Sequence, residues 1–135
     1  TFSNYGGFLD RRDAKMDKKG WKKKIIAHCE IIGTYQDAFL PVIETLASTL
    51  EQRDKTYKEF QESGGLSVIQ YTNKGGSTNM TKNPLLVLWD DLNKSALAYW
   101  RDLGLTPAGF KKIDETAVRR KKTSSLADAI KILGG

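Results

Sequence analysis

A run of apolar residues spaced alternately by four and three constrains the fold of this chain more than any other feature. Its members are Phe39, Ile43, Leu46, Leu50, Tyr57 and Phe60. Such spacings place side chains on one face of a helix, and a stripe repeated over about three heptads is typical of a long helix packed along another. Arg53 interrupts the stripe once, and Ser63-Gly64-Gly65 supplies a stop. The sequence therefore predicts a long helix that ends at about Glu62.

Two signals compete for the start of this helix. Gly33 can end a preceding helix, and Thr34 can serve as the N-cap of the long one, with Asp37 three residues further on. Pro41, however, would remove a hydrogen bond from a helix that began at Thr34. We therefore expect either a helix capped by Thr34 with a kink at Pro41, or a later start.

Two more segments carry apolar helical faces. The first segment runs from about Ala14 to Ile32. Its apolar face is formed by Trp21, Ile25, Cys29 and Ile32, and His28 lies at the edge of that face. The second begins at Asn83-Pro84, an N-cap followed by proline at the first helical position, and ends at Gly104. Its face is formed by Leu85, Leu88, Trp89, Leu92, Ala96, Tyr99, Trp100 and Leu103. We expect the aromatic residues of both faces in the core or in subunit contacts, and stacking on bases is the alternative.

The remaining segments are shorter. Residues 66–82 combine β-prone stretches with the turn sequence Asn73-Lys74-Gly75-Gly76, which predicts a β-hairpin, and an ordered loop is the alternative. Thr106-Pro107 opens a short helix containing Phe110 and Ile113. A last short helix, capped by Ser124 or Ser125, would contain Leu126, Ala129, Ile130 and Leu133.

The predicted fold is mainly α, a long-helix hairpin or bundle with an inserted β-hairpin and a short C-terminal helix. We divide the chain into an N-terminal arm (1–13), a helical domain (14–113) with the hairpin at 66–82, and a basic C-terminal tail (114–135). The apolar stripes exceed what three helices of one copy can cover, so we expect a homo-oligomer. The single cysteine, Cys29, favours a reducing compartment, and no apolar run is long enough for a membrane span.

The net charge of +6 is gathered at the two ends of the chain. Residues 1–30 hold eight Lys and Arg against four Asp and Glu, and residues 111–135 hold seven against three. Residues 31–110 hold seven basic against nine acidic side chains. This asymmetry favours a polyanionic partner, because basic side chains release counterions from phosphates. The alternative is that the basic ends only keep the chain soluble.

The basic runs supply the candidate binding residues. Those on and before the first helix, assigned to nucleic-acid binding, are Arg11, Arg12, Lys15, Lys18, Lys19, Lys22, Lys23 and Lys24. Those expected in a linker, as a mobile arm for DNA or for a protein partner, are Arg119, Arg120, Lys121 and Lys122. Lysines on a helix present a fixed row of charges to phosphates. No Asn, Gln or Arg stands at an evident recognition-helix N-terminus, so base-specific readout is not predicted.

The sequence predicts no catalytic residue, metal or cofactor. His28 has no second His or Cys with which to share a metal, and it points about 100° away from its helical neighbour Cys29. Lys74-Gly75-Gly76-Ser77-Thr78 lacks the Gly-Lys-Ser/Thr ending of a phosphate-binding loop. Asp90-Asp91 has no further carboxylates at helical spacing, as a divalent cation site would require. We therefore expect a protein that is not an enzyme.

The segment from Asn83 to Ile113 resembles the small terminase subunits of tailed bacteriophages. The resemblance rests on a helix that opens Asn-Pro-Leu and ends in Leu103-Gly104-Leu105-Thr106-Pro107-Ala108. Upstream, a helix with Trp21, the Gly33-Thr34 to Asp37 entry and a Gly-rich connection occur in the order of that family, so the resemblance covers roughly residues 18–113. The chain departs from the family at Phe110, where Arg is common in relatives, and Lys111 follows.

The resemblance implies a DNA-packaging adaptor encoded by a phage or prophage and acting in the host cytoplasm. It implies a ring-shaped homo-oligomer that recognises viral DNA and delivers it to the large terminase subunit, which holds the ATPase and nuclease. The rival hypothesis from the residues alone is a helical oligomeric scaffold or interaction protein without DNA binding. A titration with long duplex DNA separates the two.

Overall fold

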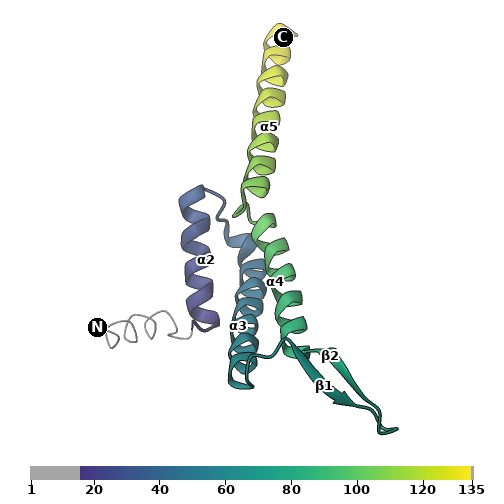
Figure 1. Cartoon of the computed structure of the whole chain (residues 1–135). Coiled ribbons are helices and arrows are strands. Elements are labelled where there is room, and N and C mark those ends of the chain that lie inside the picture. The colour runs from purple at the N-terminus through teal and green to yellow at the C-terminus, as the bar shows by residue number, and fades with distance from the viewer. Residues whose placement is uncertain (1–15, 135) are drawn as a thin grey trace, which may run out of the picture.

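The computed structural model describes residues 16–134, with the backbone alone for residues 117–125. Figure 1 shows helices α2 (Lys18–Ile32), α3 (Leu40–Glu62), α4 (Pro84–Asp102) and α5 (Pro107–Leu133), and a short 3-10 turn, η1 (Asp37–Phe39), precedes α3. Two antiparallel strands, β1 (Val68–Thr72) and β2 (Thr78–Lys82), join α3 to α4. The predicted mainly-α fold with an inserted β-hairpin is confirmed. The expected N-terminal arm lies outside the described residues.

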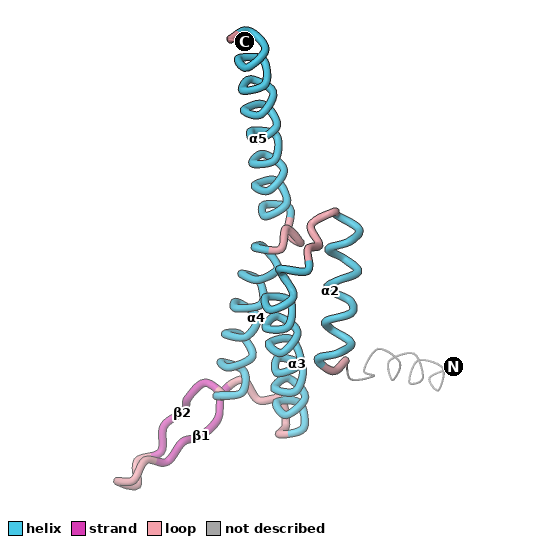
Figure 2. Tube along the Cα trace, turned by 180° about the vertical axis from the view of Figure 1, so that it is seen from behind, coloured by secondary structure: helices cyan, strands magenta, loops and turns pink. Residues whose placement is uncertain are grey.

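Helix α3 lies between α2 and α4 and packs against both. Helix α4 runs antiparallel to α3, so their long apolar faces meet along the bundle (Figure 1). The hairpin projects from one end of the bundle and α5 from the other, as the view from behind in Figure 2 also shows. The bundle therefore leaves two elements in solvent at opposite ends.

The core forms where the three bundle helices meet. Its buried residues are Ile25 and Cys29 of α2, Ile43, Leu46, Ala47 and Leu50 of α3, Ala96 of α4, and Leu103 directly after α4. Phe60 of the predicted stripe is also buried, whereas the first and fifth stripe residues, Phe39 and Tyr57, remain 37% and 39% exposed. Tyr57 contacts Trp89 of α4, with 5.3 Å between ring centroids. The stripe thus describes the core-facing side of α3, with Phe39 and Tyr57 at its edges.

Of the two alternatives for the start of the long helix, the later start is the one observed, and Thr34 does not cap it. Helix α3 begins at Leu40 and carries Pro41 in its first turn, where a missing N–H removes no hydrogen bond from the helix. The Thr34 hydroxyl instead donates to the Leu103 carbonyl at 3.0 Å, which ties the α2–α3 connection to the end of α4. Proline placement therefore overrides the local capping signal.

The tight turn between β1 and β2 orders the hairpin tip. The Asn73 side-chain oxygen accepts hydrogen bonds from the Gly75 and Ser77 N–H groups, both at 3.0 Å. Gly76 has a φ of +84°, as a three-residue hairpin loop requires at its last position. Five paired positions follow, from Thr72↔Thr78 to Val68↔Lys82.

The α4–α5 junction is a compact sequence of helix stop and helix start. Gly104 adopts a φ of +74°, and the Leu105 N–H donates to the Trp100 carbonyl at 2.8 Å, which closes α4. Thr106 then caps α5 by accepting from the Gly109 N–H at 3.1 Å, and Pro107 occupies the first helical position. The predicted stop, cap and restart are all present.

The prediction of a linker within the C-terminal tail is wrong, because the backbone of residues 119–122 is helical. The two short helices expected beyond Thr106 belong to the single helix α5, which also includes residues 119–122. Between Gly109 and Gly134 the chain contains neither Gly nor Pro, so nothing in the sequence stops the helix. The basic run at 119–122 is therefore held on a helix rather than on an extended arm.

Candidate nucleic-acid interface

The lysines of α2 lie on a helix whose start and end are both capped. The Asp17 carboxylate accepts from the Gly20 N–H at 2.8 Å, so α2 begins at Lys18 rather than at about Ala14. Gly33 ends the helix with a φ of +78°. Ile25 and Cys29 face α3 and are fully buried. The opposite side of α2 is therefore the side that a nucleic acid can approach.

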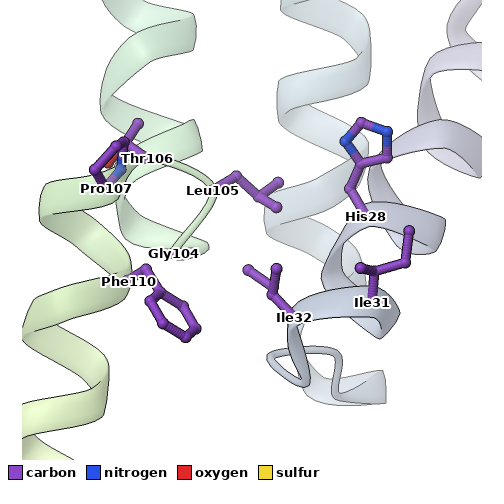
Figure 3. A pocket seen from close by; sticks show the side chains of 8 residues that line it. All are labelled: His28, Ile31, Ile32, Gly104, Leu105, Thr106, Pro107 and Phe110. Carbon is purple, nitrogen blue, oxygen red and sulfur yellow. The ribbon is translucent and has the colours of Figure 1, made fainter.

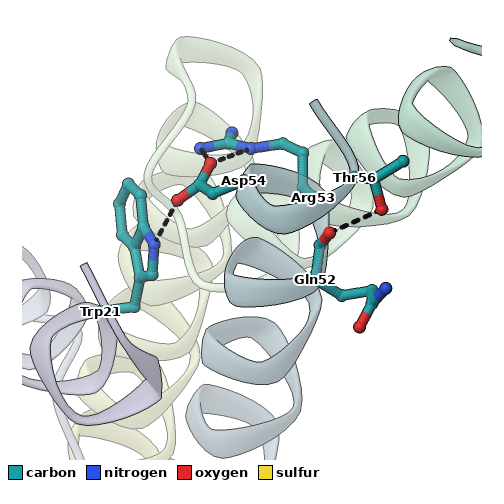
Figure 4. A network of polar contacts seen from close by, with 5 residues as sticks. All are labelled: Trp21, Gln52, Arg53, Asp54 and Thr56. Atoms are coloured by element: carbon teal, nitrogen blue, oxygen red, sulfur yellow. Dashed lines mark hydrogen bonds and ion pairs between the residues drawn. The ribbon is translucent and has the colours of Figure 1, made fainter. Parts of the chain in front are cut away.

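A polar network fixes α2 against α3 (Figure 4). The Trp21 indole N–H donates to one carboxylate oxygen of Asp54 at 2.9 Å, while Arg53 holds the other oxygen at 2.9 and 3.0 Å. The Lys18 backbone N–H donates to Glu51, and this hydrogen bond lowers the pKa of that carboxyl. Because these bonds join residues 33 apart in sequence, they set the orientation of the α2 lysines.

The structure divides the predicted lysines into two groups. Lys22 faces α3 and pairs with Glu44 at 2.8 Å, and the hydrogen bond from Lys22 lowers the pKa of this carboxyl. A salt bridge already neutralises Lys22, so this residue is a poor candidate for a phosphate contact. The other lysines of α2 are exposed, and they are Lys18, Lys19, Lys23 and Lys24. They are distributed around the solvent-exposed side and the first turn of α2, and we call these four exposed lysines together the α2 lysine face.

Other contacts account for the aromatic and cysteine residues of α2. Lys24 places its ammonium group 5.3 Å from the Trp21 ring centroid, and Arg53 approaches the same ring at 5.4 Å. Trp21 is therefore held within the protein, which agrees with the expected packing role. Burial raises the pKa of the Cys29 thiol, which disfavours a nucleophilic thiolate. His28, expected at the core edge, is exposed.

Several predicted site residues cannot be placed. Arg11, Arg12 and Lys15 lie outside the described residues. For Arg119, Arg120, Lys121 and Lys122 the structure gives only the backbone position in α5. The candidate interface is therefore limited to the α2 lysine face.

An open apolar groove of about 490 Å³ lies between the end of α2 and the α4–α5 junction. Figure 3 shows Ile32, Leu105 and Phe110 facing this space. The other lining residues are His28, Ile31, Gly104, Thr106 and Pro107. Phe110, 43% exposed, gives this surface an apolar side chain from the first turn of α5.

The described residues contain no group of three or more His, Cys, Asp or Glu side chains placed to hold a metal ion. In the same part of the chain, no helix has the length and apolar character that crossing a membrane requires. Asp90 pairs with Lys94 at 2.8 Å, in agreement with a solvated helix face rather than a cation site.

The comparison with protein families gives a match over most of the chain. Residues 18–119 match the family described as phage terminase, small subunit. This match includes the α2 lysine face, the bundle, the hairpin and the α4–α5 junction. No match was found among curated proteins or among solved structures. With its helical bundle, capped junction and basic first helix inside the matched region, this chain belongs to the phage terminase small-subunit family.

Proposed function

We propose that this chain binds double-stranded viral DNA through the α2 lysine face and brings it to the large terminase subunit for packaging. The observation that carries the proposal is the set of exposed lysines on a helix locked to α3 by the Trp21–Asp54 and Lys18–Glu51 hydrogen bonds. The capped helix fixes the backbone positions of these lysines, so their side chains can reach phosphates without any folding of the helix on binding. The chain acts in this role as an adaptor without catalysis.

Self-association follows from apolar side chains that the bundle leaves uncovered. On α4, Val87, Leu88 and Leu97 are between 43% and 49% exposed. On α5, the exposed apolar residues include Phe110, Ile113, Leu126, Ile130, Ile132 and Leu133. Solvent-exposed apolar surface on two long helices favours contact with further copies. We assign these helices to the contacts of a ring-shaped homo-oligomer, and the basic run Arg119–Lys122 to contact with DNA or the large subunit.

The first test measures the salt dependence of DNA binding. The triple variant Lys19→Ala, Lys23→Ala, Lys24→Ala is expected to bind random-sequence duplex DNA more weakly and to reduce the slope of log K against log salt by about 2.7, at about 0.9 for each lost phosphate contact. Fluorescence anisotropy between 50 and 200 mM salt, a range in which such contacts change affinity strongly, gives this slope.

A charge-matched control is available on α3 and α4. Lys55, Lys58 and Lys94 each pair with a carboxylate four residues away, so replacing all three by Ala removes the same charge. The control variant and Lys22→Ala are each expected to change the slope of log K against log salt by less than about 0.9, the value for one phosphate contact. Equal slopes in the α2 variant and the wild type would remove the α2 lysine face from the interface. A wild-type chain that binds no duplex DNA would favour the scaffold hypothesis.

The second test measures the mass of the native assembly. Native mass spectrometry of the full chain is expected to give a multiple of 15.1 kDa. Leu97→Asp should shift the distribution towards smaller species, because it places a charge on the exposed apolar side of α4. Ser48→Asp, at an exposed position of α3, serves as the control. A strict monomer at micromolar concentration would overturn the assembly proposal.

A further inference from the structure

The hairpin is the element that the proposed function leaves unexplained. Both strands project from the bundle (Figures 1 and 2), and nine of their ten residues are exposed, the exception being the partly buried Ile69. A two-stranded hairpin alone is marginally stable in water, so a surface that covers it is expected. The question is which partner chemistry fits the side chains it presents.

The two faces of the hairpin differ in composition. Because cross-strand partners share a face, the register places Val68, Gln70, Thr72, Thr78, Met80 and Lys82 on one side. We call these six residues the ribbon face. The other side holds Ile69, Tyr71, Asn79 and Thr81, and Ile69 is partly buried at its base. The ribbon face is therefore the one that is open along its whole length.

The charge around the hairpin fits a polyanion. Residues 63–89 contain no Asp or Glu, whereas Lys74 and Lys82 are both present and exposed. Lys74 lies in the tip loop and Lys82 at the base of β2, so the two charges stand at opposite ends of the ribbon. The chain has 16 acidic residues, and leaving 27 consecutive positions free of them gives residues 63–89 a formal charge of +2.

The size of the hairpin fits one groove of duplex DNA. The major groove is about 12 Å wide and admits a two-stranded ribbon. A strand of five residues spans roughly 17 Å, at about 3.4 Å per residue. A ribbon lying lengthwise in the groove therefore separates Lys74 and Lys82 along the groove, where each can reach a phosphate of the groove wall.

The ribbon face also offers groups that contact base edges. Asn73 is committed to the turn and Thr72 to Thr78, but no hydrogen bond among the described residues engages the Gln70 side-chain amide. A glutamine amide can donate and accept at the same time with adenine, and methyl-bearing side chains contact the thymine methyl group. Met80, directly opposite Gln70, and Val68 supply such apolar contacts.

We propose that the β1–β2 hairpin is a second DNA-binding element, which enters the major groove with Gln70 towards the bases and Lys74 and Lys82 at phosphates. This proposal rests on the DNA-binding function proposed above. It adds sequence discrimination, which the α2 lysine face lacks because ammonium groups on a helix surface read only the backbone. Because the ribbon face also exposes apolar residues, the alternative outcome of the test is that the hairpin contacts a protein instead of DNA.

The test compares affinity and sequence preference in hairpin variants. Lys74→Ala with Lys82→Ala is expected to lower the salt slope by about 1.8, while the ion-paired double control Lys58→Ala with Lys94→Ala leaves it unchanged. After selection of preferred sites from a random duplex pool, Gln70→Ala is expected to reduce the ratio of preferred to random affinity by about 5- to 100-fold. Gln61→Ala, at an exposed position of α3, is the matched control.

The outcomes separate the two proposals. If the wild-type chain does not bind duplex DNA, the proposed function itself is wrong. If the Lys74, Lys82 and Gln70 variants bind DNA with the affinity and sequence preference of the wild type, only the hairpin proposal is wrong. If those variants instead lower the native mass at unchanged DNA affinity, the hairpin is a contact between copies and the major-groove assignment is wrong. Far-UV circular dichroism should stay unchanged in all variants, since the replaced side chains are exposed.

Discussion

Replacing Leu46 by Ala is expected to lower the free energy of unfolding by about 3–5 kcal/mol. Leu46 is 0% exposed and lies on α3, the helix that packs against both α2 and α4. The truncation therefore removes apolar burial and opens a cavity that two neighbouring helices border. Urea unfolding followed by circular dichroism should show a lower midpoint with an unchanged slope. In thermal unfolding this corresponds to a fall of roughly 10–20 °C.

The matched control is Leu97→Ala on α4. Leu97 is 49% exposed, so the same truncation removes much less buried surface and should cost below about 1.5 kcal/mol in the isolated subunit. Association would add to the measured stability, so both variants are compared across a range of protein concentrations. A concentration-dependent loss in Leu97→Ala and a concentration-independent loss in Leu46→Ala would assign the two leucines to subunit contact and core. Equal losses at all concentrations would contradict the described core.

The elements predicted well from the sequence are those bounded by local chemistry. Gly33 and Gly104 end helices with positive φ, and Asn83 and Thr106 cap helices through their own side chains. These signals act within a few residues, so tertiary packing seldom alters them. The start of α3 was left between two alternatives because two local signals conflicted, and in the structure the proline outweighs the threonine.

The continuity of α5 shows the limit of reading apolar periodicity alone. Residues 114–125 lack an apolar stripe and so were assigned to a tail and linker. A helix that projects into solvent needs no stripe, only residues that tolerate helix and an absence of stops. The lack of Gly and Pro between Gly109 and Gly134 was the more informative signal.

The candidate site was predicted in composition but not in geometry. The charge count identified the first basic helix, yet it could not show that Lys22 turns towards Glu44, because this pair joins residues 22 apart across two helices. The hairpin lysines were missed because only two are present. The signal that could have identified them is the absence of acidic residues from 63 to 89, which a count of basic runs does not register.

Gly109→Ala is expected to destabilise the chain by about 3 kcal/mol and to change the direction of α5 relative to α4. A Cβ atom at Gly109 would overlap the Arg101 carbonyl oxygen and lie 2.9 Å from its carbon. The obstacle is backbone rather than a flexible side chain, so the end of α4 and the start of α5 must separate. Urea unfolding measures the loss, and pulsed electron paramagnetic resonance between labelled cysteines at positions 95 and 127 measures the direction. The native Cys29 is buried and should not take up label.

Helix propensity alone predicts the opposite sign for this variant. Alanine is favoured over glycine within a helix by about 1 kcal/mol, so without the clash Gly109→Ala would stabilise α5. Gly75→Ala is the control, because its Cβ would meet only Asn73 at 3.4 Å and its φ is not positive, so we expect a change within about 1 kcal/mol. A more stable Gly109→Ala variant with unchanged label distances would show that α4 and α5 do not meet as described. A less stable variant with altered distances would show that this glycine sets the angle at which α5 leaves the bundle. Since α5 carries apolar residues proposed for subunit contact, the same variant should then also alter the native mass.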